Sequence, residues 1–225
     1  EKSADDVTGE ALKVWAREWV QGGISPARVN RRMSVLLRGY NLAMQSDPPL
    51  IEKKPPWKGL KESSPRSGTW AWEDFVRVRA ALPPHARIPV SIEYWCGMRA
   101  GEAHKIEWAQ IRFDRKSLTV YIHLKGETTK TDEQRVVAMS GDLYEVLDLW
   151  DTQTKSLYPS CPHVCHYHGR RLASIKTAWQ GACVKVGLGR WENPKGKYAG
   201  NRKYRGPLVH DFRRTAVTNM EDAGV

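Results

Sequence analysis

The stretch Pro207-Leu208-Val209-His210-Asp211-Phe212-Arg213-Arg214-Thr215-Ala216-Val217-Thr218-Asn219-Met220 decides how the rest of this chain is interpreted. Asp211 is a candidate N-cap, because its short side chain can accept a hydrogen bond from the first turn of a helix. The residues that follow are apolar at i, i+4 and i+8, which predicts a helix with one buried face. These apolar residues are Phe212, Ala216 and Met220.

His210 and Arg213 stand three residues apart across the start of this predicted helix. The positive end of a helix attracts anions, so an imidazole and a permanently charged guanidinium there can both reach one phosphate. Such a pair is suited to chemistry at phosphate oxygens. An ordinary turn histidine beside solvated arginines explains this segment equally well when it is taken alone, so other stretches must decide.

The charge of the chain favours a polyanionic partner. Its 225 residues carry a formal net charge of +11, with a sequence pI near 9.6. Residues 167–214 hold twelve Lys and Arg against two acidic residues, and residues 1–66 hold twelve against eight. Residues 67–166 hold twelve against thirteen, so the excess lies in two blocks around a neutral middle. This distribution is typical of a protein that closes around nucleic acid, although basic loops without that role are common.

The length and the apolar content restrict the number of domains and the kind of protein that this chain can form. At 225 residues the chain can form one large or two small domains with a hydrophobic core. It contains no long apolar run and no signal-like N-terminus, so we expect no membrane partner and a cytoplasmic location. Four cysteines without a framework spacing indicate free thiols, and these are Cys96, Cys161, Cys165 and Cys183.

Two amphipathic helices are predicted before residue 47. The first covers about 8–20, and the second opens at Ser25-Pro26. Polar residues in the first turns of the second helix could enter a major groove or lie along phosphates, or they could form an ordinary solvated face. These candidate DNA-binding residues are Arg28, Asn30, Arg31 and Arg32. Two helices bury too little surface to stand alone, so we expect them to pack against further structure.

A domain boundary is predicted where Pro, Lys, Ser and Gly dominate, between residues 47 and 68. We assign residues 58–68 to an extended basic linker. The remaining residues, 69–225, mix helical and strand patterns, which predicts an α+β, mainly helical domain. Helical spacing covers about 70–82, 142–150 and 173–186.

Two strands joined by a polar hairpin loop are predicted in the middle of this domain. Residues 118–124 alternate apolar and polar side chains, and residues 135–139 supply the second strand. The loop between them carries Lys125 and Lys130, and lysines at a hairpin tip are usually only solvated.

An apolar run over 89–95 leads into Cys96-Gly97-Met98-Arg99-Ala100-Gly101-Glu102, with helical spacing after it. Arg99 is therefore expected at the mouth of a helix. A surface ion pair between Arg99 and Glu102 is the bland alternative, and the two interpretations are compatible.

A glycine-rich basic loop is predicted over residues 187–206, shortly before His210. Its last basic residues are further candidates for DNA binding, because they precede the helix start at which a phosphate could bind. These candidates are Arg202, Lys203 and Arg205.

The order of these motifs resembles the tyrosine recombinases, also called phage integrases. Arg99 lies in a segment like that of the family's first arginine, and Lys130 lies in a polar loop before a strand, as the family's lysine does. His210-Asp211-Phe212-Arg213 is similar to the family's His-x-x-Arg box. The resemblance implies an integrase-type catalytic domain with a small antiparallel β-sheet over 69–225. It also implies that residues 1–57 are the end of an all-α core-binding domain that clamps DNA.

The resemblance further implies site-specific DNA recombination or integration through a covalent 3′-phosphotyrosine intermediate. Arg99 and Arg213 would hold the scissile phosphate and neutralise charge on its oxygens, without a metal or another cofactor. Lys130, or Lys125 in the same loop, would protonate the departing 5′ oxygen. His210 would hydrogen-bond the phosphate or accept the proton of the nucleophile.

Glu102 resembles an acidic position of the family that orients the arginine without contacting the phosphate itself. We expect Arg214 to be structural.

One departure from the family pattern concerns the nucleophile. The family's tyrosine follows a second His or Trp box downstream of the His-x-x-Arg helix, and Tyr198 and Tyr204 both precede that helix here. We therefore expect this chain to bind double-stranded DNA without cleaving it. The assembled enzyme would work as a tetramer on paired sites.

Three other interpretations stay open at this stage. Residues 161–168 are dense in zinc-ligand types, but no second pair stands at finger distance and the alternation fits a short strand, so we assign no metal site. A non-catalytic DNA-binding or regulatory protein that retains the fold would show the same basic blocks. A type IB topoisomerase would use similar chemistry, but the helical segment before the linker is more similar to the integrases.

Overall fold

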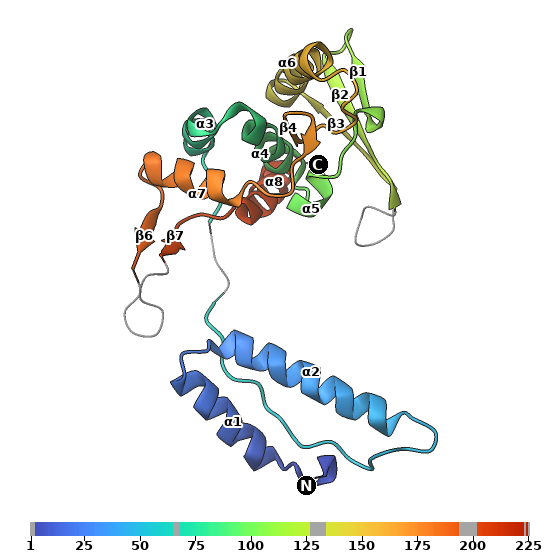
Figure 1. Ribbon diagram of the computed structural model, residues 1–225, viewed down its shortest axis with the longest axis vertical. Coiled ribbons are helices and arrows are strands. Elements are labelled where there is room, and N and C mark those ends of the chain that lie inside the picture. The colour runs from blue at the N-terminus through green and yellow to red at the C-terminus, as the bar shows by residue number, and fades with distance from the viewer. Residues whose placement is uncertain (1–2, 65–67, 127–133, 194–201, 223, 225) are drawn as a thin grey trace. The chain divides into compact units, whose positions relative to one another are not determined.

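The computed structural model describes residues 3–64, 68–126, 134–193, 202–222 and 224. The chain divides into two compact units, Glu1–Ser67 and Gly68–Val225, each with its own hydrophobic core (Figure 1). The first unit contains the helices coloured blue in Figure 1, and the second contains the later helices and every strand of the described residues.

The first unit is built on two helices. A 3₁₀ turn, η1 (Ala4–Asp6), precedes α1 (Gly9–Gln21), and α2 (Pro26–Met44) opens with its proline at the first helical position. Thr8 caps α1, because its hydroxyl accepts a hydrogen bond from the Ala11 amide. Both helices predicted for this part of the chain are confirmed. Their shared core consists of Leu12, Ala16, Val29 and Met33.

The extended chain after α2 belongs to the same unit. Trp57 and Leu60 pack against the core of the helical pair. Part of the segment that the sequence assigns to the linker therefore contacts α1 and α2.

The second unit is mainly helical, as predicted, and α4 is its central element. α4 (Pro84–Cys96) follows α3 (Trp72–Ala81) and ends just before a one-turn helix, α5 (Ala100–Ala103). The sequence showed α4 only as an apolar run, because Pro89 lies inside the helix and interrupts its pattern. The remaining helices are α6 (Asp142–Leu157), α7 (Lys176–Lys185) and α8 (Phe212–Asp222).

A three-stranded antiparallel sheet covers one side of α4 in the order β1-β2-β3. β1 (Ile111–Asp114) pairs with β2 (Thr119–Leu124), which pairs with β3 (Arg135–Ser140). The strand predicted from alternation is β2, and the second predicted strand, after the loop, is β3. No strand is predicted over β1, which has four residues and follows directly on the 3₁₀ turn η2 (Trp108–Gln110).

Two short hairpins complete the described strands. β4 (His166–Tyr167) pairs with β5 (Arg170–Arg171), and β6 (Arg190–Glu192) pairs with β7 (Lys203–Arg205). The second hairpin lies inside the segment predicted to be a basic loop, so that prediction was wrong for these six residues. Each of these strands has only three residues, which are too few for alternation to mark a strand in the sequence.

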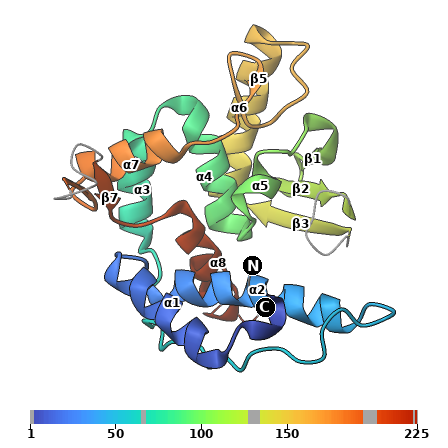
Figure 2. The same cartoon turned by 60° about the horizontal axis from the view of Figure 1, so that its bottom comes forward.

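Two hydrophobic cores meet on α4. Ile88, Ile92 and Cys96 face the sheet and α6, while Val90 and Tyr94 face α3, α7 and α8. Figure 2 shows α4 between these two groups of elements. Aromatic rings fill the second core: the Phe75 and Tyr94 rings stack at 3.9 Å, and Phe212 meets Tyr94 edge-on at 5.5 Å. Since Phe212 opens α8, this packing fixes where α8 begins.

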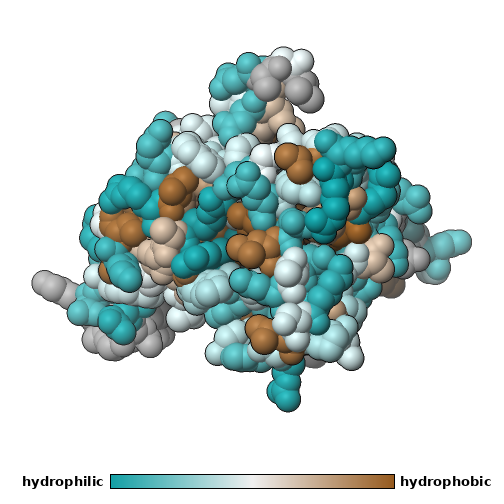
Figure 3. Space-filling view, turned by 90° about the horizontal axis from the view of Figure 1, so that it is seen from above, coloured by the Kyte–Doolittle hydropathy of each residue, from teal (hydrophilic) through white to brown (hydrophobic). Residues whose placement is uncertain are grey.

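The surface shown in Figure 3 is mostly hydrophilic, with hydrophobic side chains in separate small patches. No helix among the described residues combines the length and the apolar character needed to cross a bilayer.

Candidate functional site

The turn that carries Arg99 packs directly against α8. Gly97 ends α4 with a left-handed backbone, φ +59°, which favours glycine. A Cβ atom at this position would lie 3.0 Å from the Cβ of Ala216 on α8. The missing side chain therefore lets the end of α4 and the first turns of α8 approach closely.

Arg213 fastens α8 to the same turn. Its Nη1 donates a hydrogen bond to the Gly97 carbonyl oxygen at 3.0 Å, two residues before Arg99. Phe212 and Thr215 on either side of it are buried, so Arg213 reaches the turn from a fixed helix. The structure thus brings together the segments of two residues that lie 114 positions apart in the sequence, Arg99 and Arg213.

Glu102 holds Arg99 from the protein interior. Its carboxylate is only 5% exposed, and Oε1 accepts a hydrogen bond from Arg99 Nη1 at 2.9 Å. Oε2 accepts one from the Arg99 backbone amide at 3.3 Å, which closes the turn of α5. The Arg99 side chain is 39% exposed, so the ion pair orients it without covering it. The surface ion pair weighed in the sequence analysis is present and is compatible with ligand binding.

A third charged residue completes this cluster. Arg135, the first residue of β3, places Nη2 3.2 Å from Glu102 Oε2. Burial raises the pKa of Glu102, but the hydrogen bonds from Arg99 and the charges of Arg135 and Arg99 outweigh it, so the pKa lies below its ordinary value. The sequence predicts Arg135 only as the start of a strand. The spacing of two residues could have indicated its inward contact, because Arg135 lies on the same face of β3 as the partly buried Val137 and Met139.

His210 lies in a 3₁₀ turn, η5 (Val209–Asp211), rather than directly at the helix start. The Asp211 carboxylate accepts a hydrogen bond from the Leu208 amide at 2.8 Å, so it closes this turn, and α8 begins at Phe212. The prediction of a simple N-cap at Asp211 missed the turn. The His210 side chain is exposed, and its ring has no hydrogen-bond partner within the described parts of the chain.

The lysine of the predicted site, Lys130, lies outside the described residues. Lys125, the alternative in the same loop, directly follows β2 and is exposed. It lines a depression of about 330 Å³ together with Gln134 and Arg135. Arg135 therefore lines the same depression as Lys125 and also contacts Glu102.

The β6–β7 hairpin divides its predicted DNA-binding residues between two faces. Lys203 and Arg205 share one face, where Glu192 Oε2 accepts a hydrogen bond from Arg205 Nε at 2.8 Å. This hydrogen bond and the one from Arg190 lower the pKa of the Glu192 carboxyl. The guanidinium of Arg202 instead lies 5.5 Å from the centre of the Trp191 ring.

In the first unit, Asn30 uses its side chain within the protein. Its amide oxygen accepts from the Leu60 amide at 2.8 Å, and its Nδ2 donates to the Leu60 carbonyl at 2.9 Å and to Glu62 Oε1 at 2.7 Å. Asn30 therefore ties the extended segment to α2. The neighbouring candidates Arg28, Arg31 and Arg32 are exposed on α2, and Arg32 lies 5.1 Å from the Trp19 ring centre.

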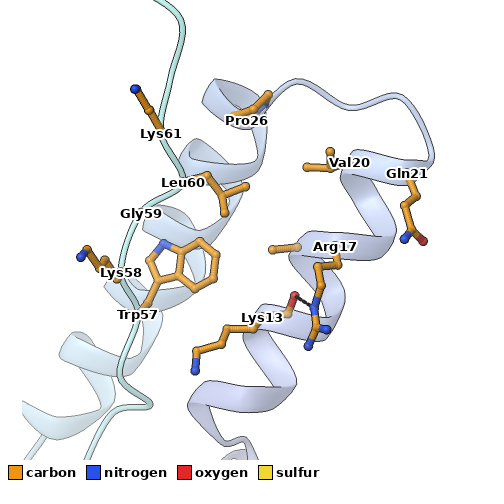
Figure 4. A pocket seen from close by; sticks show the side chains of 11 residues that line it. Lys13, Arg17, Val20, Gln21, Pro26, Trp57, Lys58, Gly59, Leu60 and Lys61 are labelled. Atoms are coloured by element: carbon orange, nitrogen blue, oxygen red, sulfur yellow. Dashed lines mark hydrogen bonds between the residues drawn. The ribbon is translucent and has the colours of Figure 1, made fainter.

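A cavity of about 710 Å³ opens between α1, the start of α2 and residues 57–61 (Figure 4). In Figure 4 the Trp57 ring projects toward α1, and Lys58 and Lys61 extend from the other side of the same segment. Lys13 and Arg17 line the cavity from α1. The residues that line this cavity are therefore partly basic and partly apolar, the apolar ones being Ala16, Val20, Pro26, Trp57 and Leu60.

The zinc alternative finds no support in the described residues. They contain no group of three or more His, Cys, Asp or Glu side chains arranged to hold a metal ion. Within the segment considered for zinc, Cys165 Sγ donates to the Ala103 carbonyl at 3.4 Å, and His166 Nε2 lies 2.8 Å from Thr154 Oγ1. These side chains serve the packing of the core.

Solved structures share this fold at low sequence identity. Lambda integrase (residues 75–356), a dimer bound to a COC′ core site, matches with a TM-score of 0.71 and 16% identity over 97% of this chain and 75% of that chain. Tn1549 transposon integrase with transposon right end DNA matches with a TM-score of 0.69 and 14% identity over 100% of this chain and 76% of that one.

XerH recombinase bound to its difH substrate matches with a TM-score of 0.64 and 14% identity over 98% of this chain. The chain spans 62% of the length of that XerH chain. No curated protein matched the sequence significantly. The model of the phage integrase family matches residues 75–225, about two thirds of the chain. The chain therefore belongs to the phage integrase family, the tyrosine recombinases.

Proposed function

We propose that this chain binds double-stranded DNA and activates the scissile phosphate in site-specific recombination or integration through a covalent 3′-phosphotyrosine intermediate. The observation that carries the proposal is the junction of the Arg99 turn with α8. Arg213 donates a hydrogen bond to the Gly97 carbonyl two residues from Arg99, and the Arg99 side chain stays 39% exposed while Glu102 orients it. Membership of the phage integrase family supports the same reaction class.

The charges of this junction suit phosphate chemistry without a metal. Arg213 bonds to a neutral carbonyl, and within the described residues no carboxylate lies at ion-pair distance from it, so its charge is available to a ligand. Two guanidinium groups can neutralise the charge that develops on the phosphate oxygens in the transition state. His210, exposed in the turn before α8, would hydrogen-bond the phosphate or accept the nucleophile's proton.

A general acid must protonate the departing 5′ oxygen. We assign this role to Lys130 by the family resemblance, with Lys125 as the alternative. Lys125 borders the depression that Arg135 also lines, which supports a lysine on this side of the site.

The attacking tyrosine is not assigned within this chain. Tyr204 precedes the His-x-x-Arg box, packs against the second core and donates its hydroxyl hydrogen bond to the Pro207 carbonyl at 3.2 Å. It is therefore part of the structure that leads into α8. We propose that residues 1–225 bind DNA and hold the phosphate without cleaving it.

We further propose that residues 1–57 are the end of a core-binding clamp, that residues 58–68 link it to the catalytic domain, and that the protein works in the cytoplasm. The exposed arginines of α2 and of the β6–β7 hairpin would contact phosphates. The full protein would act as a tetramer on paired sites. Lambda integrase has been solved both as a dimer on a core site and as a tetramer on a Holliday junction, which supports this arrangement.

A nicked suicide duplex tests the proposal, because a cleaved strand that diffuses away traps the covalent intermediate. We expect residues 1–225 to bind the duplex and to form no covalent adduct. An adduct formed by this chain would contradict the assignment of the nucleophile. The protein expressed from its complete reading frame should form an adduct that Arg213→Ala abolishes. Binding without an adduct in that protein would instead favour a non-catalytic DNA-binding role.

A further inference from the structure

Arg135, the first residue of a hairpin strand, directs its guanidinium to Glu102 while its side chain stays 43% exposed. It pairs with Leu124 in the sheet register, and opposite residues of an antiparallel pair share a face. Leu124 is 3% exposed and belongs to the core beside α4. Arg135 thus continues the inner row of the sheet, and its guanidinium reaches Glu102 at the end of that row.

The Glu102 carboxylate is divided between two guanidinium groups. Oε1 accepts from Arg99 Nη1 at 2.9 Å, and Oε2 accepts from Arg135 Nη2 at 3.2 Å. A buried carboxylate with both oxygens engaged has little freedom to rotate, and charge-assisted hydrogen bonds of this kind are strong. Arg135 therefore fixes the orientation of the group that orients Arg99.

Arg135 also changes the charge that Arg99 can offer. A carboxylate paired with Arg99 alone would neutralise it, and a phosphate would meet a group with no net charge. With Arg135 on the same carboxylate, the three side chains carry a net charge of +1. The second arginine beside Glu102 therefore leaves a positive charge for a phosphate at Arg99.

We propose that Arg135 is a positioning residue of the phosphate site, which acts through Glu102 to orient Arg99 and to keep it a net cation. This inference rests on the function proposed above. Arg135 itself is not assigned a contact with DNA.

Arg112 provides a matched control on the same sheet. It lies on β1 opposite Tyr121, with its guanidinium 4.4 Å from the centre of that ring, and it is exposed. Arg112→Gln and Arg135→Gln each remove one positive charge from this sheet, but only the second removes a contact with Glu102.

The first experiment follows the Glu102 carboxyl by ¹³C NMR in residues 1–225 as the pH is changed. The groups that face this carboxyl are Arg99, the N-cap of α5, and Arg135 on β3. We expect a higher Glu102 pKa in Arg135→Gln and an unchanged one in Arg112→Gln. An unchanged pKa in Arg135→Gln would overturn the inference, whether or not the chain binds DNA.

The second experiment measures duplex DNA affinity at one salt concentration in a double-mutant cycle. We expect Arg135→Gln to weaken binding about threefold to tenfold, and Arg112→Gln less than about twofold. In a Glu102→Gln background both substitutions should have the same small effect, because the route through the carboxylate is gone. An equal loss from Arg135→Gln in both backgrounds would show that Arg135 acts on DNA by its own charge, and would overturn the inference.

Arg135→Lys keeps a cation beside Glu102 but not the guanidinium geometry, so it should retain more affinity than Arg135→Gln. This variant keeps the test decisive if Arg135→Gln folds poorly, because a large loss in a folded Arg135→Lys would contradict an electrostatic role. If the unaltered chain fails to bind duplex DNA, the proposed function fails. The Glu102 titration then still decides the inference about Arg135.

Discussion

Glu93 should make the second unit less stable as the pH rises. It lies on α4 with 1% of its surface exposed, and its Oε1 is 3.8 Å from Nε2 of His104. Neither atom has a hydrogen-bond partner within the described residues. Burial raises the pKa of Glu93 to about 8, so its carboxyl is protonated and neutral in the folded protein at neutral pH.

Two titratable groups lie near Glu93, and burial shifts their pKa values so that both are uncharged at neutral pH. The pKa of His104 is lowered by burial, and its Nδ1 lies 3.3 Å from the Ala173 carbonyl oxygen, so a neutral imidazole faces Glu93. The buried Cys165 thiol is the other titratable group that interacts with Glu93, and its pKa is raised by burial and by that carboxyl. A protonated Glu93 beside a neutral histidine suits this surrounding, because neither group carries a charge.

The magnitude follows from the raised pKa. An ordinary carboxyl pKa is 4.5, so between pH 5 and pH 7 the unfolded chain loses the Glu93 proton while the folded chain keeps it. The folded state then binds more protons, and the free energy of unfolding falls with rising pH. At about 1.36 kcal/mol per pKa unit, the loss is about 2.5 kcal/mol over this window, and it continues up to about pH 8.

Glu93→Gln removes this proton linkage while it keeps the shape of the side chain. We expect the stability of the variant, relative to the unaltered chain, to increase by about 2.5 kcal/mol from pH 5 to pH 7 in urea unfolding of the second unit. The contribution of His104 itself is present in both proteins, so it largely cancels in the difference. Glu145→Gln, at an exposed position of α6, is the control and should show no such trend. A difference that does not depend on pH would refute the reasoning.

Three further outcomes are expected. Gly97→Ala should cost at least about 1 kcal/mol of unfolding free energy, because its left-handed backbone disfavours a side chain and α8 lies against it; an unchanged melting temperature would contradict this. Asn30→Ala should destabilise the first unit by about 1–3 kcal/mol, since Leu60 loses both hydrogen bonds, whereas unchanged protease resistance of residues 3–64 would argue against it. Arg213→Ala should weaken duplex binding by less than about tenfold in a fluorescence titration, and complete loss would argue against many shared phosphate contacts.

The sequence was sufficient for the elements that carry regular patterns. The alternation in residues 119–124 identified β2, and the i, i+4, i+8 spacing after Asp211 identified α8. The spacing of His210 and Arg213 is a local property of the chain and suggests phosphate chemistry, whereas Arg99 joins this predicted site only through the resemblance to the tyrosine recombinases.

Contacts between distant elements were not predictable in this way. The position of Asn30 near a helix start predicts a DNA-binding residue, because a polar side chain there says nothing about the segment that folds back on it. The sequence shows Arg135 only as a strand residue, because its partner Glu102 becomes evident only when the face of β3 and the position of α5 are known. Both residues are polar groups whose partners depend on the tertiary fold.

The β6–β7 hairpin shows a second limit. Its strands consist of Arg190–Glu192 and Lys203–Arg205, in which charged residues stand on one face and Trp191 and Tyr204 on the other. Each strand runs charged, aromatic, charged, but three residues are too few for this order to be recognised as a strand pattern in the sequence. Only the pairing of the strands reveals the order of this segment.

The central claim is that Arg99 and Arg213 form one phosphate site. A structure of this chain bound to duplex DNA would show most directly which phosphate each of the two arginines contacts. We expect both guanidinium groups to donate hydrogen bonds to oxygens of the same backbone phosphate, with Glu102 still bonded to Arg99 and Arg135. Binding of the two arginines to different phosphates, or a duplex bound away from the junction of the Arg99 turn with α8, would contradict the account.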